Sequence, residues 1–155
     1  YIQFGEFEGT VSEVNIVSTK LTTVDNRTII IPNGALSNGT INNFSHNNVR
    51  RVDWLIDVEY GTDVEKAKEL LKIMIEADSR ILTKENGAPA DPFIGLSALA
   101  SSSIQIVARA WVNKADYWPV KFDMNETVYK ELPKHGINFP YQKIDVTIMN
   151  PNQIS

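Results

Sequence analysis

The chain has 155 residues, of which 43% are hydrophobic and 22% are charged, a composition typical of one globular domain or two small ones. The net charge of -4 gives no broad attraction to nucleic acid or anionic lipid, and the lack of cysteine excludes disulfides and cysteine-ligated metal sites. No apolar run approaches the roughly 18 residues of a membrane helix. The sequence begins at Tyr1 without an initiator Met, so we expect a fragment of a longer protein.

The first third of the sequence predicts short β-strands rich in Val, Ile and Thr, residues that suit a pleated, half-buried surface. The expected strands cover residues 10–17, 19–24, 28–31 and 40–44. Asp25 and Asn26 form a turn signal, and Pro32 should end a strand because proline has no backbone N–H to donate. Several short strands joined by turns predict a small Sm-like or SH3-like β barrel.

The remainder of the sequence alternates between strand and helix periods. The expected order is a strand over 52–60, a helix over 63–78, strands over 93–99 and 103–112, a helix over 117–135 and a strand over 143–149. Thr62 and Glu65 form a capping-box pattern at the start of the first helix, and Asp116 is the expected N-cap of the second. A β-α-β-β-α-β order is typical of a ferredoxin-like α+β domain.

The polar stretch after Ser45 separates the two patterns, so the predicted domain boundary lies there. We therefore interpret residues 1–46 as a small β domain, residues 47–141 as an α/β ferredoxin-like domain, and residues 142–155 as a C-terminal strand and tail.

The sequence offers no constellation that could do chemistry. Its two histidines, His46 and His135, fall in different predicted domains, and neither has a second histidine at metal-binding spacing. Phosphate-binding loops and nucleophile-elbow motifs are absent. The carboxylate pairs have structural explanations, such as the favourable charge of Asp63 and Glu65 at a helix N-terminus. We expect no enzyme activity and no catalytic, cofactor or metal site.

Two features could mediate contacts. Arg50 and Arg51 form the one compact basic pair, which would either bind an anion or lie solvated at the domain joint. The strand over 103–112 carries Val107 and Trp111 on the face opposite its main apolar row, and apolar groups on both faces suit an oligomer.

Four segments together resemble the small-conductance mechanosensitive channel (MscS) family. They are EGTVSEV from Glu8, STKLTTVDN from Ser18, IIIPN from Ile29 and INNFS from Ile41. The likeness continues through residues 49–51, 60–63, 100–104 and 136–141 and covers nearly the whole chain. The residues that carry the pattern are Gly9, Thr19, Asp25, Pro32, Asn33, Asn43 and Ser45. We expect them to be structural, with Asn33 and Asn43 bonding backbone across the turn after Pro32.

The resemblance implies a fold and a function. Family members are inner-membrane channels of bacteria that open under membrane tension and release solutes on hypo-osmotic shock. Their transmembrane helices are followed by a β domain and an α/β domain, and seven subunits enclose a cytoplasmic vestibule with side portals. The last strand of each subunit joins an inter-subunit parallel barrel. This chain would then be the vestibule portion, an oligomeric scaffold and solute filter without the pore helices.

The resemblance also implies partners and sites. The implied partners are further copies of the chain, which would assemble as a heptamer, the membrane through upstream helices, and permeating ions and small solutes. No nucleic acid and no cofactor are implied. The candidate portal or joint residues are His46, Arg50 and Arg51. The candidate subunit-interface residues are Val107, Trp111, Ile144, Val146 and Ile148.

Two alternatives from other classes stay open on the sequence. Small five-stranded barrels bind RNA or single-stranded DNA in soluble modules, but Lys20 and Arg27 are the only basic residues before Ser45. A ligand-sensing domain on the ferredoxin-like half is the other alternative, since that fold hosts many functions, although no residue names a ligand.

Overall fold

A computed structural model describes residues 1–141 of the chain. They fold as two compact units. The first comprises Tyr1–Arg50 and Asn113–Ala115, and the second comprises Arg51–Val112 and the described residues from Asp116 onward.

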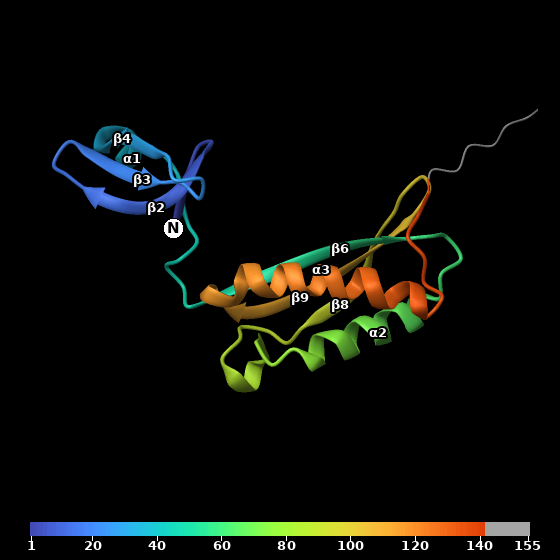
Figure 1. The fold of residues 1–155 in the computed structure, drawn as a ribbon. Coiled ribbons are helices and arrows are strands. Elements are labelled where there is room, and N and C mark those ends of the chain that lie inside the picture. Colours follow the sequence, from blue (N-terminus) through green and yellow to red (C-terminus); the bar gives the residue numbers. More distant parts are fainter. Residues whose placement is uncertain (142–155) are drawn as a thin grey trace, which may run out of the picture. The chain divides into compact units, whose positions relative to one another are not determined.

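The first unit is a five-stranded antiparallel sheet with the strand order β4-β3-β2-β1-β5, of which β2, β3 and β4 are labelled in Figure 1. Its strands are β1 (Ile2–Phe4), β2 (Phe7–Val14), β3 (Ser18–Thr22), β4 (Thr28–Pro32) and β5 (Ile41–Asn43). The register of β2 against β3 shifts between Val11 and Glu13, an irregularity of the kind that bends a strand. Asn26 has φ 63 in the turn between β3 and β4, as the turn signal there predicts.

The core of the first unit is small. Ile2, Leu21 and Ile31 are buried, and Phe4, Ile29 and Leu36 pack around them. Two elements were not expected from the sequence. The strand β1 is only three residues long and pairs with β5 about forty positions away. A short helix, α1 (Asn33–Asn38), replaces the expected loop and begins directly after Pro32, whose φ of -58 suits a helix start.

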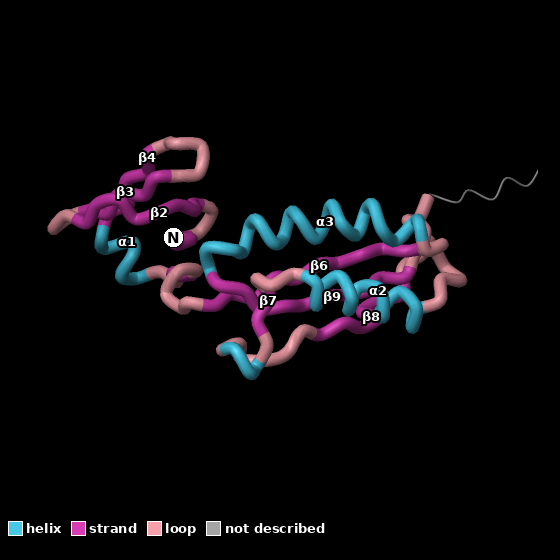
Figure 2. Tube along the Cα trace, turned by 60° about the horizontal axis from the view of Figure 1, so that its bottom comes forward, coloured by secondary structure: helices cyan, strands magenta, loops and turns pink. Residues whose placement is uncertain are grey.

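The second unit is a four-stranded sheet with two long helices. Its elements are β6 (Val49–Val58), α2 (Val64–Ala77), β7 (Ile81–Leu82), β8 (Phe93–Leu99), β9 (Ile104–Asn113) and α3 (Tyr117–Lys134), with the 3-10 helices η1 (Lys84–Asn86) and η2 (Lys114–Asp116). Figure 2 shows β9 between β6 on one side and β8 on the other, and β7 pairs with the same side of β9 as β8. The predicted β-α-β-β-α order is confirmed for the long elements, but the two-residue strand β7 between α2 and β8 was not expected. The expected strand over 143–149 lies outside the described residues.

Both helices cover the same face of this sheet. Alternate residues of β6, from Val52 to Val58, are buried in one cluster with Ile106 and its alternates on β9. The same cluster contains Leu71 of α2 and Val120 of α3. The other face of the sheet, which we call the outer face, carries the intervening residues of each strand.

The predicted helix boundaries are nearly right, but one cap is wrong. Thr62 does not cap α2, because its hydroxyl donates to the Glu59 carbonyl at 2.7 Å. Asp63 is the N-cap instead and accepts from the Lys66 amide at 3.1 Å. Asp116 precedes α3 but makes no side-chain capping bond. Gly136, just after α3, has φ +79, the left-handed conformation in which many helices end.

Candidate functional site

Asn33 fastens the turn between β2 and β3. Its side-chain amide donates to the Asn15 carbonyl at 2.7 Å and to the Ile16 carbonyl at 3.0 Å. Its backbone N–H donates to the Val17 carbonyl at 2.9 Å. One residue at the start of α1 therefore holds three successive carbonyls, and the tip that it holds displays Ile16, 98% exposed, and Val17, 74% exposed.

Two other residues of the MscS-like pattern act on backbone geometry. Gly9 of β2 lies against β3, and a Cβ added to it would sit 2.7 Å from the Thr22 carbonyl oxygen, so only glycine fits without a shift. Asp25 accepts from the Thr23 hydroxyl and pairs with Arg27 at 2.7 Å. These bonds, the one from Thr23 first, hold the pKa of the Asp25 carboxyl below its usual value.

The end of the first unit is closed by Asn43 and Ser45. The Asn43 side-chain oxygen accepts from the Ser45 amide at 3.2 Å. Lys114, which follows β9, donates from its ammonium to the Ser45 carbonyl at 3.2 Å and from its backbone N–H to the Asn48 carbonyl at 2.9 Å. Asn43 and Ser45 thus bond backbone and each other rather than forming a ligand pocket.

The candidate portal residues do not make a single cationic patch. Arg50 is half-buried, and its guanidinium lies 4.6 Å from the centre of the Phe44 ring. Arg51 instead makes a two-pronged contact with Asp53, at 2.7 Å and 3.0 Å. His46 is exposed in the segment between β5 and β6. The adjacent arginines thus use different partners.

Polar contacts run across the outer face of the sheet. Arg109 of β9 lies 3.5 Å from Asp53, which also holds Arg51, so two cations share one carboxylate. Further along, Gln105 donates to Asp57 at 3.1 Å. These contacts join β9 to β6 across a face that neither helix covers.

The candidate interface residues lie in different surroundings. Val107 is only 5% exposed, so it is already buried within the single chain. Trp111 is half-buried and pairs with Leu82 of β7. Ile144, Val146 and Ile148 lie outside the described residues.

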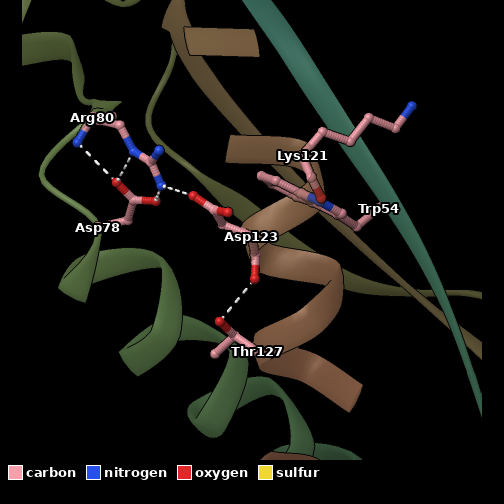
Figure 3. A network of polar contacts seen from close by, with 6 residues as sticks. All are labelled: Trp54, Asp78, Arg80, Lys121, Asp123 and Thr127. Carbon is pink, nitrogen blue, oxygen red and sulfur yellow. Dashed lines mark hydrogen bonds and ion pairs between the residues drawn. The ribbon is translucent and has the colours of Figure 1, made fainter. Parts of the chain in front are cut away.

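The sequence did not reveal a polar network of Asp78, Arg80 and Asp123 that links the end of α2 to α3 (Figure 3). Arg80, just after α2, donates to Asp78 at 2.9 Å and 2.7 Å and reaches Asp123 of α3 at 2.8 Å. The bonds from Arg80 hold the pKa of Asp78 below its usual value and outweigh partial burial, which acts in the opposite direction. Arg80 and Asp123 are 43 positions apart, and no local pattern signals such a pair.

Trp54 provides a second link from the sheet to α3. Its indole N–H donates to the Lys121 carbonyl at 3.1 Å (Figure 3). That carbonyl lies in the helix interior, so the bond adds to the helical ladder rather than capping it. Trp54 is a core residue, as its place on the apolar face of the strand predicts.

Within residues 1–141, no group of three or more His, Cys, Asp or Glu side chains is placed to hold a metal ion. In the same range, no helix is long and apolar enough to cross a membrane. The Asn33, Asn43, Arg51 and Arg80 side chains described above bond to backbone groups or to neighbouring side chains of the same chain.

Two family models match the chain in the order of its two units. The model described as "Mechanosensitive ion channel, beta-domain" matches residues 1–46, and "Mechanosensitive ion channel MscS, C-terminal" matches residues 52–139. The β domain and the α+β domain that follows it are therefore those of the mechanosensitive ion channel family. The chain belongs to the MscS family.

Relatives and solved structures agree with this assignment. The chain is 39% identical to a small-conductance mechanosensitive channel of Edwardsiella ictaluri, over 94% of this chain and 49% of the relative. It is 35% identical to an uncharacterised MscS family protein of Buchnera aphidicola, over 99% of this chain and 52% of the relative. The chain thus spans about half the length of the curated relatives that it matches.

Among solved structures, the closed-state crystal structure of Helicobacter pylori MscS matches with a TM-score of 0.86 at 29% identity, over 96% of this chain and 57% of that one. A cryo-EM structure of Arabidopsis thaliana MSL1 matches with a TM-score of 0.70 at 20% identity, over 92% of this chain and 51% of that one, and this likeness concerns the fold alone.

Proposed function

We propose that this chain is the cytoplasmic vestibule portion of a tension-gated channel of a bacterial inner membrane, which releases solutes on hypo-osmotic shock. The observation that carries the proposal is the match of both mechanosensitive-channel models, in order, to the two units of the chain. The likeness to Helicobacter pylori MscS over 96% of the chain supports it.

On this proposal the chain acts mechanically and electrostatically. Several copies, seven by analogy with the family, form a hollow scaffold that admits ions and small solutes and retains larger molecules. The membrane helices that open and close would precede Tyr1 in the full-length protein. The portals through which solutes pass would lie near residues 46–51.

The test uses the full-length gene product in bacterial cells that lack their own mechanosensitive channels. Expected results are survival of a sudden drop in external osmolarity and a conductance in excised membrane patches that appears only under suction. As a control, the same gene truncated before the codon for Tyr1 separates the contribution of this portion from that of the upstream helices. A full-length protein that inserts in the membrane but gives neither survival nor a suction-dependent conductance would refute the proposal.

A further inference from the structure

A groove with a volume of about 610 Å³ lies between α2 and α3, and its size is within the range of small-ligand sites. Its α2 wall is apolar and consists of Leu70, Ile73, Met74 and Ala77, which follow the i, i+3, i+4 and i+7 spacing of one helix face. Ile73 is 57% exposed although it is a large aliphatic residue. This wall can therefore remove apolar groups of a ligand from water.

The α3 wall of the groove is polar. Asp123, Thr127, Glu131 and His135 line it at intervals of four residues, which keeps them in one stripe along the helix. Figure 3 shows Asp123 and Thr127 on the side of α3 that faces α2. Asp123 and Glu131 are eight residues apart, which is about 12 Å along the helix axis. The apolar wall thus faces two carboxylates that are separated along the length of the groove.

Both carboxylates keep one oxygen available to a ligand. Asp123 accepts from Arg80 at 2.8 Å through Oδ2, and its Oδ1 accepts no hydrogen bond from the described residues. Glu131 accepts at 2.8 Å through Oε1 from Lys134, which is not part of the lining, and within residues 1–141 its Oε2 has no donor. Arg80 also binds Asp78, so three carboxylates of the lining share one guanidinium. The lining therefore carries an excess of negative charge.

We propose that this groove binds a linear aliphatic polyamine, a methylene chain with an ammonium group at each end. One ammonium group binds Asp123 and the other binds Glu131, while the chain between them lies against Ile73 and Met74. A ligand with a single positive charge would reach only one of the two carboxylates, and an anion would be repelled by the lining. This site goes beyond the proposed function and does not depend on it, because the inference concerns binding alone.

Isothermal titration calorimetry of the full-length protein in detergent tests the site, with titration into detergent alone as the blank. The main probe is 1,8-diaminooctane, whose two ammonium groups can reach both carboxylates. A second probe, 1,3-diaminopropane, is too short to reach both, and a third, 8-aminooctan-1-ol, has the long chain with one charge. We expect saturable binding of 1,8-diaminooctane and about tenfold weaker binding of the other two, because each loses one charge-assisted hydrogen bond.

Variants of the two carboxylates place the ligand. Asp123→Asn and Glu131→Gln should each weaken the binding of 1,8-diaminooctane by about five- to tenfold, because each removes one charged acceptor. The matched control is Glu126→Gln, which removes a carboxylate of the same helix that pairs with Lys130 and lies outside the lining, and it should leave the affinity unchanged. Equal affinities of the wild type and both groove variants, or affinities that do not depend on chain length, would overturn the proposal and leave the proposed channel function in place.

Cysteine labelling asks whether the groove is open in the assembled protein. In a full-length background without other cysteines, Ile73→Cys should react with a maleimide, and 1,8-diaminooctane should slow the reaction as the site saturates. Glu126→Cys is the control and should react at the same rate with and without the diamine. An Ile73→Cys protein that does not react would mean that a second copy or another segment covers the groove, and the proposal would be wrong.

Discussion

Thr19 donates a 2.8 Å hydrogen bond to the side-chain oxygen of Asn33, whose amide group in turn donates to the turn between β2 and β3. Thr19 is buried, so its hydroxyl must find a partner within the unit. Thr19 and Asn33 both lie in segments that carry the MscS-like pattern. Their contact explains why an asparagine rather than an aspartate suits position 33. A side-chain amide can both donate and accept, whereas an ionised aspartate carboxylate can only accept.

Asn33→Ala should destabilise the first unit by about 1–3 kcal/mol, because it removes two donors to backbone carbonyls and leaves the Thr19 hydroxyl without its acceptor. Hydrogen exchange of the full-length protein should show faster exchange in the β2–β3 hairpin, with residues of α2 unchanged. The matched control, Asn42→Ala in β5, removes an exposed asparagine and should leave exchange as in the wild type. Equal effects of the two variants would contradict the role given to Asn33.

Gly9→Ala should also weaken the first unit, by about 1–3 kcal/mol, since the new Cβ would meet the Thr22 carbonyl oxygen at 2.7 Å and the strands must move apart. Gly34→Ala is the control, because a Cβ there meets no atom within 4 Å and alanine favours helix. It should be neutral or stabilise by up to about 1 kcal/mol. Protease sensitivity of the first unit distinguishes the two variants, and a Gly9→Ala protein as resistant as the wild type would refute the steric argument.

Asp78→Asn should cost the second unit about 1 kcal/mol near neutral pH, because it weakens a partly buried charged contact with Arg80. The pKa of Asp78 is lowered in the folded state, so its contribution is present above the unfolded pKa of about 3.9 and is lost as pH falls through the folded value. Unfolding free energies followed from pH 7 downward through the folded pKa should therefore show the difference between the variant and the wild type shrinking only below about pH 4.

Asp123→Asn is the companion to that experiment. Its side chain is 60% exposed, so solvent screens the contact with Arg80 and the expected cost is below about 0.5 kcal/mol. A cost as large as that of Asp78→Asn would mean that the link between α2 and α3, rather than the local Asp78–Arg80 contact, carries the stability.

Replacing both Arg50 and Arg51 by Glu should shift the reversal potential of the open channel toward cations in a salt gradient. The reason is the proposed position of the portals near residues 46–51, where fixed charge would act on passing ions. Lys130→Glu on α3 is the control, a charge reversal at an exposed residue outside that segment. An unchanged reversal potential in the double variant would place the portals elsewhere.

The elements with a clear period were predictable, because their own residues determine them. The alternation of β6 and the apolar stripe of α2 follow from burial of one face, which a local pattern records. The capping assignment at Thr62 was wrong because the same residue can satisfy a different partner, here the Glu59 carbonyl. The sequence shows that two neighbouring side chains, Thr62 and Asp63, could accept from the first backbone N–H groups of α2. It does not show which of them does so, and in the structure it is Asp63.

What the sequence could not predict depends on partners distant along the chain. The three residues of β1 are a strand only because β5 and β2 lie on either side. The arginine pair looked like one basic spot, yet Arg50 packs on Phe44 and Arg51 binds Asp53. The contact between Arg80 and Asp123 joins residues 43 positions apart, so residue types alone did not single it out.

The fastening of the β2–β3 tip by Asn33 affects what that tip can do. The Asn33 side chain and backbone N–H bond the carbonyls of the tip, while Ile16 remains almost fully exposed and Val17 largely exposed. A loop that is already ordered loses little conformational freedom on contact with another surface. A surface that covers these two side chains would therefore gain nearly the full free energy of burying them. A mobile loop of the same composition would lose part of that free energy to its own ordering.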